Sequence, residues 1–177
     1  MILKETDIEG AFVVVPERFA DERGYFEKVW SEREFAARGV TARFVEGNAS
    51  FNPRRGTLRG LHYQAAPHGQ AKLVRCTHGR VFDVGVDLRP RSPTFRRWVG
   101  VELSAENRLM LYLPAAFAHG YLTLEDDSEV SYLVDSVFDA ASGRGARWDD
   151  PAFQIEWPDA GTLIINERDR TYPDFRL

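Results

Sequence analysis

The chain has 177 residues, of which 44% are hydrophobic and 28% charged, and its formal net charge at neutral pH is −4. This length fits one domain, residues 1–177, which buries about 70% of its unfolded surface and needs neither disulfides nor metal to fold. The negative net charge argues against a nucleic-acid-binding surface, and no stretch reaches the length of a membrane span. The N-terminus lacks the apolar core of a secretory signal, and the single cysteine, Cys76, excludes an intramolecular disulfide. We therefore expect a cytoplasmic protein.

The predicted elements are mostly strands. Residues 11–15 form a β-branched run ended by Pro16, and residues 24–30 alternate and are rich in aromatic side chains. Ser31 is the expected cap of a short helix from Glu32 to Arg38, which Gly39 ends. Turn residues then separate closely spaced strand candidates at 43–51, 57–64, 70–78, 80–88, 95–103, 108–113, 118–124 and 129–138. This spacing is typical of an antiparallel sandwich or barrel, and the tail from about residue 140 is rich in turns.

Residues 81–88 show the clearest alternation in the chain. Val81, Asp83, Gly85 and Asp87 alternate with larger apolar side chains, which predicts a strand with one packed face and one polar face. A small barrel of about eight strands has an interior just wide enough to hold one ligand. Polar side chains that point inward from neighbouring strands would meet there in one pocket.

His62 is the first candidate for chemistry, because imidazole exchanges a proton near neutral pH. A metal site is disfavoured, since no two of the four histidines are spaced to share a strand face, and Gln64 stands where a second ligand would be. His62 could instead act as a general base if a carboxylate fixed its tautomer. Asp169 is a candidate partner, although its spacing alone favours a solvated turn aspartate. Tyr132 is also a candidate, although a strand tyrosine usually only packs.

Three cations complete the set. Lys72 lies among Ala71, Leu73 and Val74, where a lysine is costly unless it is paired, at a site, or on an exposed edge. Arg59 and Arg23 adjoin glycines, where the backbone can approach a ligand, and guanidinium groups suit phosphate. Either arginine alone would be interpreted as a surface residue.

Taken together, these segments resemble the dTDP-4-dehydrorhamnose 3,5-epimerase family of the cupin superfamily over roughly residues 10–175. The segments that carry the resemblance are residues 21–26, 56–64, 72–76, 114–120, 147–151 and 155–158. The resemblance implies an all-β, cupin-type jelly-roll barrel with short helices and an irregular C-terminal segment. It also implies a homodimer, a nucleotide-sugar substrate, and a site that uses no metal or other cofactor.

The resemblance also implies roles for individual residues in inverting carbons 3 and 5 of a 4-keto-6-deoxy sugar. His62 would be the base, Asp169 its partner, Tyr132 the acid on the opposite face, and Lys72 the cation near the ketone oxygen. The implied substrate contacts are Arg23, Phe26, Asn48, Arg59, His119, Phe138 and Arg168, with Arg23 contacting phosphate and the Phe138 ring stacking on the nucleotide base.

The chain departs from the family pattern mainly at positions expected near the nucleotide. Lys28, Glu46 and Gly143 replace a usual glutamate, glutamine and glutamate, and Phe138 replaces a usual tyrosine. The first two changes prompt the hypothesis that Lys28 and Glu46 form a compensating charge pair. The residues for proton transfer are all present, so the reaction class is implied more firmly than the nucleotide.

Three alternatives remain open. The first is an epimerase that inverts only carbon 3 or only carbon 5, on a different nucleotide sugar. The second is a barrel that binds a nucleotide sugar without turnover, in which the acid and base would be dispensable. The third is a metal-dependent cupin, which the absence of a His-x-His pattern disfavours.

Overall fold

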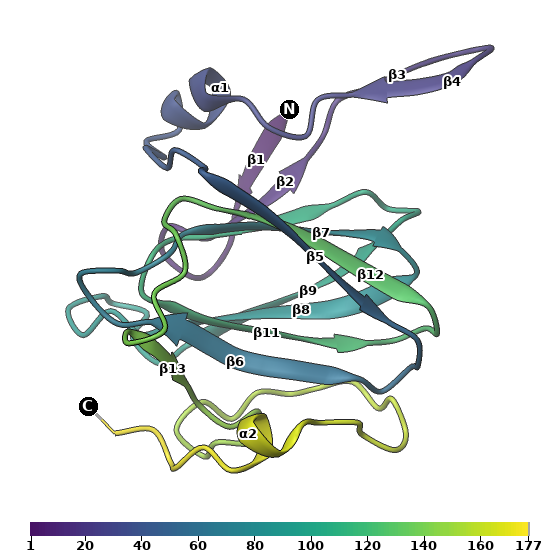
Figure 1. Cartoon of the computed structure of the whole chain (residues 1–177). Coiled ribbons are helices and arrows are strands. Elements are labelled where there is room, and N and C mark those ends of the chain that lie inside the picture. The colour runs from purple at the N-terminus through teal and green to yellow at the C-terminus, as the bar shows by residue number, and fades with distance from the viewer. Residues whose placement is uncertain (177) are drawn as a thin grey trace.

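The computed structural model describes residues 1–176 and consists mainly of two antiparallel sheets that face each other (Figure 1). The six-stranded sheet has the order β1 (Ile2–Glu5), β2 (Phe12–Val15), β10 (Met110–Leu113), β7 (Lys72–His78), β12 (Ser128–Val134) and β5 (Glu46–Asn52). The five-stranded sheet has the order β13 (Gly143–Gly145), β6 (Leu58–Gln64), β11 (Phe117–Thr123), β8 (Arg80–Asp87) and β9 (Trp98–Ser104). The predicted cupin-type jelly-roll barrel is thus confirmed.

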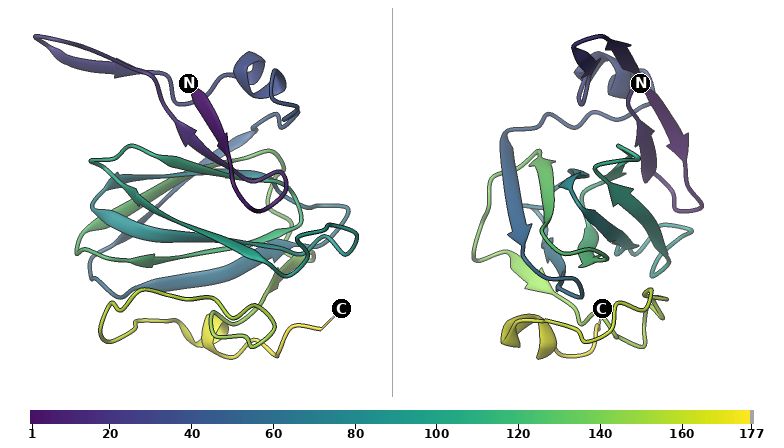
Figure 2. Two further views of the ribbon diagram at one scale, coloured as in Figure 1. Left: turned by 180° about the vertical axis from the view of Figure 1, so that it is seen from behind. Right: turned by 90° about the vertical axis from the view of Figure 1, so that its right-hand side faces the viewer.

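The remaining elements lie outside the barrel. The strands β3 (Arg18–Asp21) and β4 (Gly24–Glu27) form a separate hairpin, and the helices α1 (Glu32–Ala36) and α2 (Glu167–Arg170) are short. Figures 1 and 2 show the hairpin projecting from the side of the six-stranded sheet, whereas the irregular C-terminal segment with α2 covers the opposite side. In residues 1–176, no helix is long and apolar enough to cross a membrane.

Apolar side chains from both sheets fill the space between them. Val74, Leu111 and Val130 of the six-stranded sheet meet Val81 and Leu103 of the five-stranded sheet, and all are fully buried. Each large aliphatic side chain buried in this way stabilises the fold by roughly 1.5–3 kcal/mol. This core holds the two sheets together.

The strands predicted from residue 43 onward are all present, within a few residues at their ends. The predicted helix also forms with Ser31 as its cap, since Ser31 Oγ accepts from the amide of Glu34 at 3.4 Å, but it ends at Ala36 rather than Arg38. Four further elements were not predicted from the sequence, namely β1, β3, β13 and α2. All four are short and gain their stability from neighbouring elements rather than from their own pattern.

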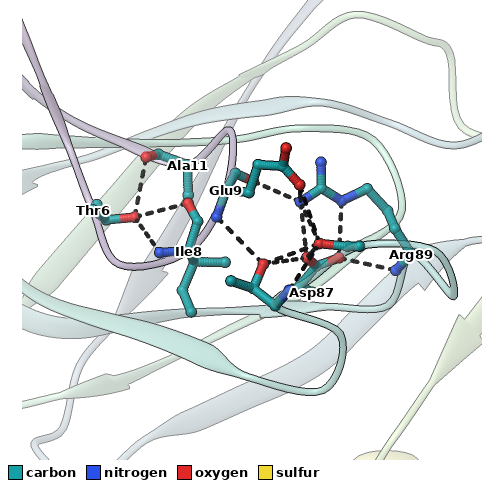
Figure 3. Close-up of polar contacts among 8 residues, drawn as sticks. Thr6, Ile8, Glu9, Ala11, Asp87 and Arg89 are labelled. Carbon is teal, nitrogen blue, oxygen red and sulfur yellow. Dashed lines mark hydrogen bonds and ion pairs between the residues drawn. The ribbon is translucent and has the colours of Figure 1, made fainter.

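The alternation in β8 is real, but its polar face is buried rather than solvated. Asp83 and Asp87 have no exposed surface. Asp87 accepts hydrogen bonds from Arg89 Nε at 2.9 Å, Ser92 Oγ at 2.5 Å and Thr94 Oγ1 at 2.7 Å, the cluster drawn in Figure 3. Burial alone would raise the pKa of Asp87, but these bonds outweigh it and lower the pKa to about 2.

The same cluster fastens the β1–β2 loop to the barrel. Arg89 Nη2 donates to the carbonyl of Glu9 at 2.6 Å, and the amide of Glu9 donates to Thr94 Oγ1 at 3.3 Å. Asp87 is therefore a structural carboxylate. Asp83 instead contacts His119, a residue of the candidate site.

Candidate active site

Ionisable side chains from both sheets meet in the barrel interior. His62 on β6 and His119 on β11 come from the five-stranded sheet, where they are direct cross-strand partners. Lys72 on β7 and Tyr132 on β12 come from the six-stranded sheet. Two adjoining cavities, an outer one of about 270 Å³ and an inner one of about 150 Å³, share His62, Lys72 and Tyr132 in their walls. Because these side chains come from two facing sheets, a flat ligand between the sheets has ionisable groups on both of its faces.

His62 is paired with a buried carboxylate. Its Nε2 lies 2.7 Å from Oδ1 of Asp169, whose side chain is 1% exposed, whereas the His62 side chain is 41% exposed. Burial alone would raise the pKa of Asp169, but hydrogen bonds from His62 and from the Gly60 amide outweigh it and lower the pKa. Asp169 is therefore ionised and can only accept, so His62 Nε2 carries the proton and Nδ1 is the nitrogen left to act as a base.

Local backbone geometry explains how Asp169 reaches β6. Asp169 lies in α2, whose cap Asn166 accepts from the amide of Asp169 at 2.7 Å. The second carboxylate oxygen, Oδ2, accepts from the amide of Gly60 at 3.0 Å. Gly60 has φ +119, and a Cβ there would lie 2.6 Å from Gly120 Cα, so only glycine allows β6 and β11 to approach this closely. The interpretation of Asp169 as a solvated turn residue is therefore wrong.

A second buried carboxylate, Asp83, contacts His119 and acts on Lys72 through its charge. His119 Nε2 lies 2.8 Å from Asp83 Oδ1, while Asp83 Oδ2 is buried without a hydrogen-bond partner. Burial lowers the pKa of His119, and Asp83 opposes this effect. Burial likewise lowers the pKa of Lys72 to about 8, again against the attraction of Asp83. Lys72 is only 8% exposed on a strand inside the sheet, so it does not occupy an exposed edge.

Tyr132 and Arg59 complete the inner cavity. Burial raises the pKa of Tyr132, with Arg59 opposing the shift, so the phenol keeps its proton at neutral pH. Arg59 is held by Asn52, whose Oδ1 accepts from Arg59 Nε at 2.8 Å. Asp83 and Asn52 were not among the predicted site residues. The alternation in residues 81–88 marked Asp83 as a polar strand residue, whereas nothing in the sequence marked Asn52.

The outer cavity contains the predicted residues Asn48, Phe138 and Arg168. Gln64, which stands where a second metal ligand was considered, instead fastens the loop that carries Phe138. Its Oε1 accepts from the amide of Asp139 at 2.6 Å, and its Nε2 donates to the carbonyl of Val137 at 3.3 Å. The Phe138 side chain, in a residue that is 66% exposed, is therefore presented at the cavity mouth. The other wall residues are Glu46, Tyr63, Gln70, Val134, Gly143 and Arg144.

Arg23 and Phe26 are not brought to this cavity within the same chain. They line a separate surface hollow on the β3–β4 hairpin, together with Phe19 and Tyr25. Arg23 is held by Asp21, which accepts from its Nε at 3.1 Å and from its Nη2 at 2.5 Å. Lys28 donates to Glu34 at 2.6 Å rather than to Glu46, so the hypothesis of a Lys28–Glu46 charge pair within the chain is wrong.

The described residues contain no group of three or more His, Cys, Asp or Glu side chains placed to hold a metal ion. His68 and His78 lie outside the two cavities, beside Asp139 and the carbonyl of Asp127 respectively. The groups gathered in the barrel are proton donors and acceptors, so the arrangement is suited to general acid–base chemistry.

Comparison with known proteins agrees with this geometry. The family model described as dTDP-4-dehydrorhamnose 3,5-epimerase matches residues 5–176. A protein of that name from Sinorhizobium fredii is 43% identical over 173 residues, which cover 98% of this chain and 89% of that protein. The crystal structure of dTDP-4-dehydrorhamnose 3,5-epimerase from Elizabethkingia anophelis has a TM-score of 0.94 at 41% identity and covers 99% of this chain and 96% of that one.

Two further similar proteins bear on substrate and outcome. An epimerase from Legionella pneumophila, solved in complex with dTDP-4-keto-L-rhamnose, has a TM-score of 0.89 at 36% identity and covers 95% of this chain and 89% of that one. A dTDP-4-dehydrorhamnose 3-epimerase from Streptomyces niveus is 39% identical over 171 residues, which cover 96% of this chain and 82% of that protein.

Proposed function

The chain belongs to the dTDP-4-dehydrorhamnose 3,5-epimerase family, and from this premise we propose that it converts dTDP-4-dehydro-6-deoxy-D-glucose to dTDP-4-dehydro-L-rhamnose. The reaction inverts carbons 3 and 5 on either side of the ketone at carbon 4. One observation carries the proposal. A histidine steadied by a buried carboxylate shares one cavity with a buried lysine and a half-buried tyrosine from the opposite sheet.

In this mechanism His62 is the general base. Its Nδ1 takes the proton from carbon 3 or carbon 5, and the electrons of the broken C–H bond form a double bond to carbon 4. The ketone oxygen thereby becomes an enolate oxygen. The imidazolium that forms is stabilised by the ionised Asp169, 2.7 Å away.

Lys72 is the proposed stabiliser of the enolate oxygen. With a pKa of about 8 it is mostly protonated at neutral pH, yet it has been moved out of water, and the attraction of Asp83 does not offset this burial. A negative charge that develops beside such an ammonium group relieves the cost of its burial. One preorganised donor of this kind contributes about 3–4 kcal/mol to transition-state stabilisation.

Tyr132 is the proposed acid that returns the proton. It stands on β12 of the six-stranded sheet, whereas His62 stands on β6 of the five-stranded sheet. A sugar ring held between the sheets therefore presents one face to the base and the other to the acid, and inversion follows from this opposition. The phenolate that remains regains its proton from solvent as the imidazolium loses one. Substrate and product are isomers, so no redox cofactor enters the balance.

The outer cavity is the proposed nucleotide site. Phe138 offers an exposed ring on which a base can stack, and Arg168 and Arg144 offer positive charge for the diphosphate. Arg59 and His119 reach the sugar from the inner cavity, and Asn48 lies between the two regions. Glu46 stands in the same wall, so the nucleotide base must offer a hydrogen-bond donor there or remain apart from it.

We also propose that the active unit is a homodimer in which each β3–β4 hairpin completes the partner's cavity. Arg23 and Phe26 match substrate-contacting positions, yet they lie on a hairpin that projects away from their own barrel (Figure 2). Phe19 and Phe26 are 58% and 67% exposed, and such apolar surface favours burial against a second copy. A cytoplasmic location suits the single buried thiol of Cys76.

Inversion at carbon 3 alone is the second candidate function, since a relative with 39% identity is named a 3-epimerase. Incubation of the protein with dTDP-4-dehydro-6-deoxy-D-glucose in deuterated buffer separates the candidates by proton NMR. We expect deuterium at both carbons and the L-rhamno product. Deuterium at carbon 3 alone would support the second candidate, and exchange no faster than with His62→Asn would leave only a binding protein.

A further inference from the structure

The β3–β4 hairpin is fixed at its root by a buried ion pair that the proposed mechanism does not use. Arg108 Nε donates to Oε1 of Glu27 at 3.0 Å, and Arg108 Nη2 contacts the same oxygen. The two side chains are only 17% and 6% exposed. Arg18, the cross-strand neighbour of Glu27, brings its Nε to 3.6 Å from the other carboxylate oxygen. Two arginines thus enclose one carboxylate where the hairpin leaves the barrel.

Alternation along the hairpin separates this root from the surface that would touch substrate. Tyr25 and Glu27 lie on one face of β4, and the guanidinium carbons of Arg18 and Arg108 lie 4.3 Å and 5.3 Å from the centre of the Tyr25 ring. Phe26 lies on the other face, opposite Phe19 of β3. The face held by the two arginines therefore decides the direction in which Phe26 points.

Arg108 is itself held in place by the turn between β9 and β10. Its φ of +58 lies in the left-handed region that non-glycine residues seldom adopt. The turn keeps this conformation because Asn107 Oδ1 accepts from the amides of Ser104 and Leu109, both at 3.0 Å. The guanidinium group is therefore presented to the hairpin by a rigid part of the barrel.

We propose that Arg108 and Glu27 are positioning residues that set the angle of the hairpin and so place Arg23 and Phe26 in the partner's cavity. The inference rests on the proposed function, and specifically on the hairpin acting on the partner. An isolated two-stranded hairpin is marginally stable in water, so its direction depends on the contacts at its root. Each strand has four residues and spans about 13 Å, so a tilt of about 10° at the root moves the tip by about 2 Å, enough to break contacts.

The first test measures steady-state kinetics of Arg108→Ala and Glu27→Gln. Because the hairpin contacts the nucleotide rather than the reacting carbons, KM should rise at least tenfold with kcat within about threefold of wild type. In a chain that already carries Arg23→Ala and Phe26→Ala, adding Arg108→Ala should raise KM no further. Arg80→Ala is the matched control, since Arg80 of β8 pairs with Glu102 of the neighbouring strand β9, away from the hairpin. An unchanged KM, or losses that add in the double background, would overturn the inference.

The second test mixes two defective chains. Arg108→Ala chains are combined with His62→Asn chains under conditions that exchange subunits, and activity is measured below KM. If the hairpin acts on the partner, half of the dimers are mixed and each has one intact site, so about a quarter of wild-type activity returns. Action on the same chain would restore nothing.

The two tests also separate this inference from the function on which it depends. Full exchange activity in His62→Asn would refute the proposed function, whereas an inactive His62→Asn with a fully active Arg108→Ala would refute only the positioning role. Glu27→Gln keeps the shape of the side chain. It therefore decides the outcome if Arg108→Ala melts below the assay temperature.

Discussion

Replacing Asp169 by asparagine should inactivate the enzyme more severely than replacing it by alanine. The amide of Gly60 can only donate, so the carboxamide oxygen of Asp169→Asn must stay 3.0 Å from it, as Oδ2 does now. The new amide group then faces His62 Nε2 at 2.7 Å and can only donate to it. The imidazole must accept at Nε2 and carry its proton on Nδ1, the nitrogen that the mechanism requires as a base.

The size of the effect follows from the tautomer. A catalytic histidine locked in the wrong tautomer by this kind of substitution loses about 10⁴-fold in turnover. Asp169→Ala imposes no tautomer and removes only the charge-assisted hydrogen bond, which contributes about 1.5–3 kcal/mol, or about 10- to 200-fold. The order wild type, alanine, asparagine is therefore a specific consequence of the Gly60 contact.

The assay is deuterium wash-in at carbon 3, followed by mass spectrometry at substrate concentrations below KM. Calorimetry with dTDP serves as the control, because neither substitution touches the outer cavity, and thermal unfolding reports whether the fold survives. An asparagine variant within tenfold of wild type, or one faster than the alanine variant, would refute the tautomer argument.

Three further substitutions test other parts of the structure. The pKa of Lys72 lies near 8, so kcat/KM should fall as pH rises through about 8. Lys72→Met should lower kcat/KM by about 10²- to 10³-fold at pH 7. The same variant should melt at a higher temperature, because a buried charge is removed. Gly60→Ala should destabilise the fold by more than about 2 kcal/mol. Gly24→Ala, at a similar φ, should destabilise it less, since a Cβ there meets nothing within 4 Å. Equal melting temperatures of the two variants would contradict the argument that β6 and β11 approach too closely at Gly60 for a side chain. The folded pKa of Asp87 is depressed to about 2, so the stability it contributes is present above its unfolded pKa and is lost as pH falls through about 2. Asp87→Asn should therefore lower the free energy of unfolding by about 2 kcal/mol at pH 7. In urea unfolding, the difference between wild type and variant should vanish near pH 2.

The positions of the barrel strands could be predicted, because side-chain alternation marks each strand and turn residues mark its ends. The four strands that carry the main site residues lie where the sequence predicts them. They are β6 with His62, β7 with Lys72, β8 with Asp83 and β12 with Tyr132. What alternation cannot give is the environment of the polar face. In β8 that face is buried, because Asp83 and Asp87 each find partners from other strands or loops.

The partnership of His62 with Asp169 could not be derived from local pattern. The two residues are 107 positions apart, and α2 is a single turn that gains its place from the Gly60 amide and the Asn166 cap. Only resemblance to the family indicated the pair. The position of Arg23 and Phe26 on a projecting hairpin likewise could not be predicted from the sequence. Alternation in residues 24–30 indicates a strand but does not indicate what the strand packs against.

The division of labour between His62 and Tyr132 is best tested by comparing isotope exchange with product formation in two variants. Tyr132→Phe should still wash deuterium into the starting sugar, because His62 can remove and return a proton on its own face, yet it should form almost no epimer. His62→Asn should do neither, while dTDP still binds. Rapid epimer formation by Tyr132→Phe, or exchange at the wild-type rate by His62→Asn, would contradict an acid and a base working from opposite sheets.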